Sequence, residues 1–250
     1  MKLKYKYIAG LFCLCLLLCN LSIIPVKHAQ AGNNNIIIPD RKAKNNSVAG
    51  YKIKEDKKEF KDKKGNVRCI VSFQYPQFTS TSPAAVKINR QLKKKSRQYF
   101  KSENFRNIKK YTKDAIKYNR FSYETDQYLW TTYCSMSYNK DNIVSFQMSE
   151  WWYAGGVTTR NYYGLNYNLD TGKELEIKDV IKGNAKTEIL KAAKKYLKGD
   201  KEAYKIIKDT KKYKFYFEKG TVYICYGGYE LNRGPGFDIF TVKIPDINKV

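Results

Sequence analysis

The sequence has 250 residues, of which 48 are Lys or Arg and 23 are Asp or Glu, so its formal net charge is +25 at pH 7. Aromatic residues make up 15% of the chain, which excludes extensive disorder and predicts one sizeable hydrophobic core or two small ones. The basic excess favours polyanions as partners, although the lysines are spread along the whole chain, as solvated surface lysines are.

The first 31 residues are typical of an export signal. Lys2, Lys4 and Lys6 precede an apolar run from Ile8 to Ile24, and Ala29-Gln30-Ala31 supplies the small residues of a cleavage site. Because the run is short for a membrane span, we expect cleavage and no transmembrane span afterwards. The protein is therefore expected to be secreted or extracytoplasmic, with an uncleaved anchor as the alternative.

Cleavage of this signal would also remove residues that several kinds of catalytic and metal site require. The chain has a single histidine, His28, which would be lost, and the remaining cysteines would be Cys69, Cys134 and Cys225. Without a histidine, a Ser-His-Asp triad, a Cys-His dyad and a His-bearing zinc site cannot form, and we expect no cofactor or metal. Cys69 and Cys134 could pair across a sheet, or all three cysteines could be small buried apolar residues.

The remainder of the chain is expected to consist of a linker and one domain. Residues 32–46 are polar, interrupted by a candidate edge strand at Ile36 to Ile38. Residues 47–250 are expected to form a single domain. The alternative is a pair of closely packed subdomains at 47–125 and 126–250.

The first part of this domain has two strand patterns followed by two helical patterns. Gly65 lies in the turn between the strands, where a left-handed backbone is needed. Ser82 and Pro83 indicate a helix start, because serine caps free amides and proline lacks the amide that the first turn leaves unbonded. The expected elements are strands at 47–60 and 66–75 and helices at 83–102 and 104–118.

From Tyr128 the apolar residues recur with a period of two, which predicts an antiparallel hairpin. The residues expected on one face of its first strand are Trp130, Thr132, Cys134, Met136 and Tyr138. The same alternation places Trp151 and Trp152 on opposite faces of the returning strand, so at least one of them is expected in the core.

The last part of the chain adds more elements of both kinds. Strands are expected at 160–169, 213–217, 221–226 and 237–244, and helices at 177–181, 185–197 and 202–208. Because helices and strands come in blocks, we expect an α+β fold, with a largely antiparallel sheet packed with two or three helices.

Three short motifs occur in an order and spacing that resemble a known family. They are an aromatic-x-Gly-Gly sequence at Tyr153 to Gly156, the LDTGKEL turn at Leu169 to Leu175, and the pattern FYF…GTVYI…YE from Phe215 to Glu230. From about Lys52 to Ile247, the chain resembles a domain of unknown function. This RsiV/PdaC-like extracytoplasmic domain is shared by RsiV anti-sigma factors and the N-terminal region of PdaC-type peptidoglycan deacetylases.

The resemblance implies an α+β domain on the outer side of the membrane. RsiV-like members are sensors that bind lysozyme, and PdaC-like members accompany a separate catalytic domain. This sequence departs from the family at Val157-Thr158-Thr159, where members often have Ala-His-Gly. Its positive charge also disfavours a basic partner such as lysozyme.

We therefore expect a non-enzymatic binding or sensing module of the bacterial cell envelope. Its expected partner is an envelope glycan, an anionic polymer or a secreted protein; nucleic acid is not an expected partner. Loops at strand ends are where a sheet usually presents binding groups, which favours the glycine-rich stretches at 154–159 and 226–236. The candidate binding residues are Trp151, Tyr153, Gly155, Gly156, Tyr229, Glu230 and Arg233.

Two alternatives from other functional classes stay open. A glycan hydrolase needs only a pair of carboxylates, and Glu150 beside the tryptophans with Glu230 in the later loop is the candidate pair. The other alternative is nonspecific polyanion binding by the lysine-rich faces.

Overall fold

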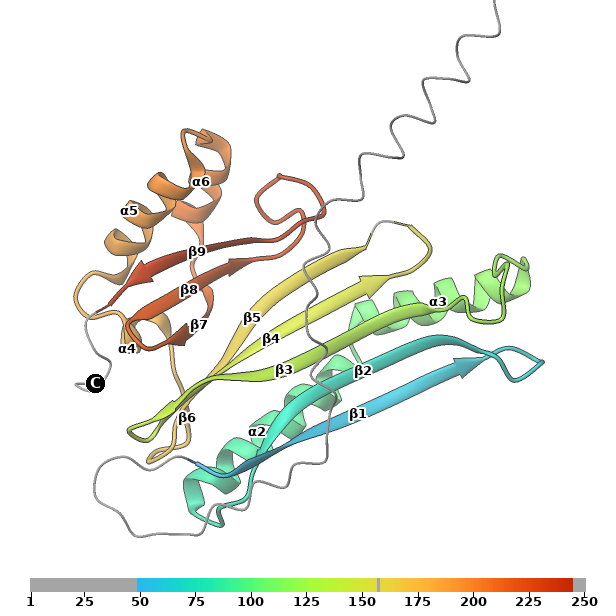
Figure 1. Ribbon diagram of the computed structural model, residues 1–250, viewed down its shortest axis with the longest axis horizontal. Helices are drawn as coiled ribbons and strands as arrows, with labels where there is room; N and C mark the ends of the chain where they lie inside the picture. The colour runs from blue at the N-terminus through green and yellow to red at the C-terminus, as the bar shows by residue number, and fades with distance from the viewer. Residues whose placement is uncertain (1–48, 157, 245–250) are drawn as a thin grey trace, which may run out of the picture. The chain divides into compact units, whose positions relative to one another are not determined.

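The structure is a computed structural model that describes residues 49–156 and 158–244. The expected signal peptide at 1–31, the linker at 32–46 and the strand at Ile36 to Ile38 lie outside these residues. The described chain combines a largely antiparallel six-stranded sheet, a three-stranded sheet and helices that follow each other in blocks (Figure 1). The predicted α+β class is confirmed.

The larger sheet has the strand order β1-β2-β3-β4-β5-β6. Neighbouring strands are antiparallel, except that β2 and β3 are parallel because two helices connect them. Strands from both halves of the alternative division at residue 125 share this sheet. The bounds are β1 Tyr51–Lys61, β2 Val67–Phe78, β3 Tyr128–Lys140, β4 Ile143–Tyr153, β5 Thr159–Asn168 and β6 Lys173–Glu174.

Helices α2 (Pro83–Tyr99) and α3 (Glu103–Lys117) both lie on one face of this sheet (Figure 1). Each begins at a serine cap, as predicted for α2: the Ser82 hydroxyl accepts a hydrogen bond from the Ala85 amide at 3.2 Å. Ile88 and Leu92 of α2 are fully buried against the sheet. Helices α2 and α3 therefore do not cover the opposite face of the sheet.

The β3–β4 hairpin was predicted correctly, but Tyr138 was assigned to the wrong face of its first strand. The register shifts between Met136 and Tyr138, which is a β-bulge. Beyond the bulge the Tyr138 ring lies 5.3 Å from the Phe217 ring of the smaller sheet. Tyr138 therefore does not share the face of Trp130, because a one-residue shift reverses the side-chain alternation.

The smaller sheet has the order β7-β8-β9 and is packed with helices α5 and α6. It crosses the larger sheet near the ends of β4 and β5: Asn166 Nδ2 donates to the Phe215 carbonyl at 2.8 Å, and the Phe217 amide donates to Ser145 Oγ at 3.0 Å. The bounds are α4 Ile177–Val180, α5 Ala185–Leu197, α6 Lys201–Asp209, β7 Lys214–Glu218, β8 Thr221–Tyr226 and β9 Asp238–Lys243.

The close approach of the two sheets explains a glycine inside a strand. A Cβ atom on Gly164 of β5 would lie 1.9 Å from the Phe215 carbonyl oxygen, so no larger residue fits without moving β7. The three cysteines of the described chain, Cys69, Cys134 and Cys225, are free thiols. Burial raises the pKa of Cys69 to about 11, as expected for an unreactive apolar thiol.

Candidate functional site

A groove of about 590 Å³ lies where the two glycine-rich stretches meet the end of the larger sheet. Its floor comes from β3, β4 and β5, and its wall comes from the β8–β9 loop (residues 227–237). We call it the aromatic groove. It is lined by Leu129, Trp151, Tyr153, Thr158, Arg160, Pro235, Gly236 and Phe237.

Several aromatic rings in and beside this groove are partly exposed to solvent. Tyr153 and Phe237 are 36% and 40% exposed, and Tyr133, whose ring lies 6.4 Å from that of Trp151, is 51% exposed. The Arg160 guanidinium stacks on the Trp151 ring at 4.1 Å, a cation–π contact that holds the indole in place. The groove therefore offers flat rings beside fixed hydrogen-bond donors.

The sheet face that carries Trp151 is poor in charge. It is the face opposite α2 and α3, because Trp152, the neighbour of Trp151, packs on Trp130 in the core at 5.8 Å. Arg160 is the only charged residue among the face positions at the centre of β2 to β5. The uncharged positions are Ile70, Ser72, Gln74, Leu129, Thr131, Tyr133, Ser135, Gln147, Ser149, Trp151 and Tyr162.

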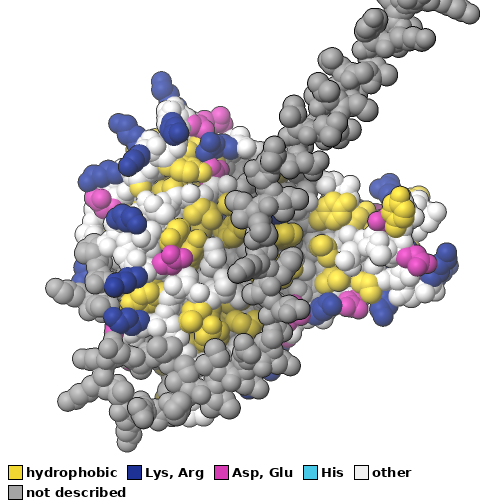
Figure 2. Space-filling view, viewed as in Figure 1, with side chains coloured by type: hydrophobic (Ala, Val, Ile, Leu, Met, Phe, Trp, Pro, Cys, Tyr) yellow, Lys and Arg dark blue, Asp and Glu magenta, His cyan; other side chains and the backbone are white. Residues whose placement is uncertain are grey.

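Figure 2 looks onto this face of the molecule. Where grey atoms leave it visible, hydrophobic side chains gather over the sheet and the blue Lys and Arg side chains lie mainly around the outside. In a chain with a net charge of +25, this distribution leaves the groove poor in charge, with Arg160 as the one charged residue of its lining.

The two predicted glycines have different roles. Gly155 has a φ of +82°, and a Cβ atom there would lie 2.9 Å from the Tyr128 hydroxyl, so the β4–β5 connection needs glycine at this position. A Cβ atom on Gly156 would meet nothing within 4 Å. Neither glycine lines the aromatic groove, although Thr158, from the same connection, does.

The other predicted residues lie in the β8–β9 loop but outside the groove. Tyr229 is 55% exposed and has a φ of +66°. The Glu230 carboxylate accepts from the Gly227 amide at 2.9 Å and pairs with Lys214. Arg233 donates to Asp238 at 2.7 Å, so Glu230 and Arg233 are held by contacts that shape the loop.

Glu150 lies on the helix-facing side of β4, not in the groove. Asn161 Nδ2 donates to its Oε1 at 2.9 Å, and the Asn161 oxygen accepts from the Gly228 amide at 3.2 Å. Removal from water raises the pKa of Glu150, opposed by the Asn161 hydrogen bond and by the nearby indole of Trp130. Trp130 Nε1 makes no hydrogen bond of good geometry with any described residue. The candidate carboxylate pair is thus linked through Asn161 and the glycine loop.

Sequence reasoning missed Arg160, Phe237 and Tyr162, whose ring lies 4.5 Å from that of Phe237. Arg160 and Phe237 are the first residues of the predicted strands at 160–169 and 237–244, and Tyr162 lies within the first of them, so the pattern indicated only strand residues. Arg160 lies opposite Trp151 on the same face of the β4–β5 pair, and no local pattern in the sequence specifies this register.

Between residues 49 and 244, no three His, Cys, Asp or Glu side chains are grouped so that they could hold a metal ion. None of the helices in the same part of the chain has the length and apolar character needed to cross a bilayer.

Comparison with known proteins gives a resemblance in fold alone. No protein-family model and no curated protein matches the chain. A member of the DUF3298 family from Bacteroides fragilis is similar, with a TM-score of 0.49, 17% identity, and coverage of 81% of this chain and 92% of that one. A DUF3298 family protein from Pseudomonas aeruginosa has a TM-score of 0.45, 13% identity, and coverage of 79% and 91%.

Both neighbours belong to a family named only as a domain of unknown function. With TM-scores below 0.5 and identities below 20%, they support no inference about ligand or activity. Neither is described as an RsiV or PdaC protein, so the resemblance to that family stays a prediction.

Proposed function

We propose that the protein is a non-enzymatic extracytoplasmic module that binds an uncharged glycan of the cell envelope in the aromatic groove. The observation that carries this proposal is the arrangement of the exposed Tyr153 and Phe237 and the half-buried Trp151 around one groove on a charge-poor sheet face. Flat rings match the apolar faces of pyranose sugars, and hydroxyl, amide and guanidinium groups beside them can bond the sugar hydroxyls.

The distribution of charge favours a neutral glycan over an anionic polymer. A polyanion site needs several cations that neutralise successive negative groups. The groove offers one, Arg160. No lysine of the described residues lines the groove.

The proposal is tested by calorimetric titration of the chain with tetra-N-acetylchitotetraose, an uncharged pyranose oligomer, and separately with polyphosphate. We expect saturable binding of the oligosaccharide that is unchanged between about 50 mM and about 500 mM NaCl, while polyphosphate binding collapses over the same range. Polyphosphate binding without any binding of the oligosaccharide would contradict the proposal and support the polyanion alternative.

The hydrolase alternative is tested in the same samples. Its candidate residues, Glu150 and Glu230, are joined through Asn161 and the glycine loop, but neither lines the aromatic groove. Mass spectrometry after incubation is expected to find intact oligosaccharide. Cleavage that disappears in Glu150→Gln would replace the binding account with an enzymatic one.

A further inference from the structure

A second concave site lies on the other side of β5, about 780 Å³ in volume. It is bounded by the C-terminal half of α2, by the edge of β5, by the residues that follow β6 and by the segment that leads into β7. We call it the lysine cleft, after Lys95, Lys211, Lys212 and Lys214 in its lining. We propose that it binds a short, extended, acidic peptide segment of a partner protein, which adds to the edge of β5 as a strand.

The first argument is the unpaired edge of β5. Its pairing with β6 is limited to Tyr167 with Glu174 and Asn168 with Lys173. The last bond along this edge runs from the Leu175 amide to the Asn166 carbonyl at 2.8 Å. Backbone groups of alternate strand residues point the same way, so the N–H and C=O of Gly164 point to this edge too.

Gly164 makes no hydrogen bond on this edge with any other described residue. Gly164 and its neighbours Tyr163, Leu165 and Asn166 all line the cleft. An exposed strand edge of this kind is the template for β-strand addition, in which main-chain hydrogen bonds provide affinity.

The ends of the free edge set the length of the occupant. On one side β6 occupies the edge from Asn166 onward. On the other side the β8–β9 loop approaches, because the Gly228 amide bonds the Asn161 side chain at 3.2 Å. The four residues between them leave room for an added strand of about three or four residues, at about 3.3 Å per residue.

The second argument is charge. Lys95 pairs with Glu174 at 3.1 Å, and Lys214 pairs with Glu230. Lys211 and Lys212 line the same cleft, are exposed, and make no ion pair with any described residue. Two unpaired cations beside a free strand edge favour an extended segment with acidic side chains.

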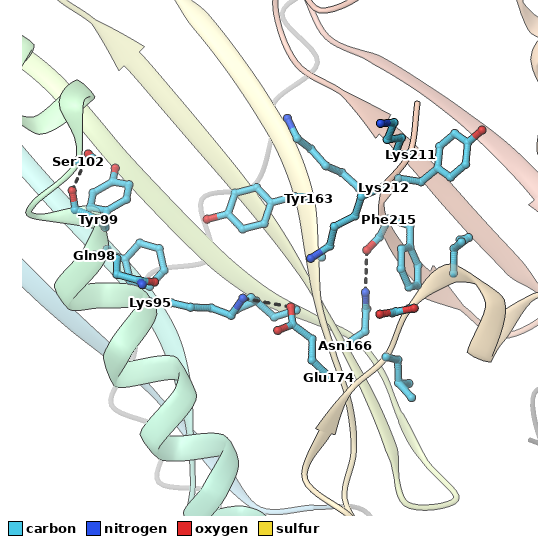
Figure 3. A pocket seen from close by; sticks show the side chains of 18 residues that line it. Lys95, Gln98, Tyr99, Ser102, Tyr163, Asn166, Glu174, Lys211, Lys212 and Phe215 are labelled. Carbon is cyan, nitrogen blue, oxygen red and sulfur yellow. Dashed lines mark hydrogen bonds and ion pairs between the residues drawn. The ribbon is translucent and has the colours of Figure 1, made fainter. Parts of the chain in front are cut away.

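The walls of the cleft fit an extended segment sterically. Figure 3 shows Tyr163 projecting from β5 toward α2, with Tyr99 and Gln98 on the helix and Lys211 and Lys212 across from it. On the sheet face next to Gly164 the Phe215 backbone lies close to β5, so it forms one wall, and the peptide would lie beside the strand on the cleft side. The cleft shares no lining residue with the aromatic groove, so this proposal is independent of glycan binding.

The probe for this site is the peptide acetyl-Glu-Val-Glu-Val-Glu-amide, titrated into the whole chain and followed by isothermal titration calorimetry. We expect saturable binding that is weakened about three- to tenfold in Lys211→Gln/Lys212→Gln, as for the loss of two exposed ion pairs. The matched control is Lys194→Gln/Lys195→Gln on exposed positions of α5, which removes the same charge and is expected to change the affinity less than twofold.

Two further measurements separate strand addition from simple charge attraction. The Gly164 amide is expected to exchange more slowly with solvent when the peptide is bound, and a backbone N-methylated version of the peptide is expected to lose binding. Equal binding of the methylated peptide, equal losses in both double variants, or no binding of the acidic peptide would each overturn the proposal.

Discussion

Asn161 and Gly228 join the larger sheet to the β8–β9 loop. The Gly228 amide donates to the Asn161 side-chain oxygen at 3.2 Å, while the Asn161 nitrogen donates to Glu150 at 2.9 Å. A Cβ atom on the adjacent Gly227 would lie 1.9 Å from the same Asn161 oxygen, so a larger residue there would displace the Asn161 side chain. One side chain therefore positions the loop that forms a wall of the aromatic groove.

Replacing Asn161 is expected to loosen this loop. Asn161→Ala removes both hydrogen bonds and leaves the Glu150 carboxyl and the Gly228 amide without partners, which costs about 1–3 kcal/mol. Hydrogen exchange at Gly228 should accelerate, and urea unfolding should show the loss of stability. Asn104→Ala, at an exposed position near the start of α3, is the control and is expected to change neither measurement. An unchanged exchange rate at Gly228 in Asn161→Ala would contradict the structural role.

Glu150 gives the protein a predicted dependence of stability on pH. Because burial raises its pKa above the usual 4.5, the folded state binds the proton more tightly than the unfolded state does. The stabilisation is therefore complete at pH values below 4.5 and is lost as the pH rises through the higher folded-state value. The variant Glu150→Gln keeps an oxygen for Asn161 and removes the charge.

This prediction is tested by comparing the urea unfolding of the unmodified chain with that of Glu150→Gln over a range of pH. The variant is expected to gain stability relative to the unmodified chain as the pH rises from 4 to 8. A stability difference that is constant over this range, or that changes in favour of the unmodified chain, would show that the carboxyl is not held in its protonated form.

The β4–β5 connection depends on glycine at one position and not at the next. In Gly155→Ala, an L-residue would have to adopt the left-handed backbone conformation of Gly155, at a cost of about 1–2 kcal/mol. Its Cβ atom would also clash with the Tyr128 hydroxyl. Gly156→Ala is the matched control, because a Cβ atom there meets open space. Thermal unfolding should show a lower midpoint for the first variant alone. Equal effects of both variants would contradict the geometry of this connection.

Much of the fold could be predicted because its signals are local. Ser82 caps α2, Gly65 allows the first hairpin turn with a φ of +90°, and the alternation around Trp151 separates it from Trp152. The parallel pairing of β2 with β3, the bulge after Met136 and the separation into two sheets could not be predicted. They depend on which distant strands meet, and alternation within a strand does not specify its partner.

The candidate site was predicted only in part, for a similar reason. The glycine-rich loops attracted attention to Tyr229, Glu230 and Arg233, but these side chains lie outside the groove, and Glu230 and Arg233 have partners within the described chain. Arg160 and Phe237 line the groove because strand register and a loop from elsewhere in the chain bring them to Trp151. Neither position has a local sequence signal.

The central claim is that Trp151 in the aromatic groove binds an uncharged glycan, and one calorimetric comparison tests it most directly. Tetra-N-acetylchitotetraose is titrated into the unmodified chain, Trp151→Ala and the control Tyr111→Ala, whose exposed ring lies on α3, away from the groove. Loss of a stacking ring is expected to weaken binding about tenfold or more in Trp151→Ala and to leave Tyr111→Ala unchanged. Equal affinity of Trp151→Ala and the unmodified chain would contradict the account.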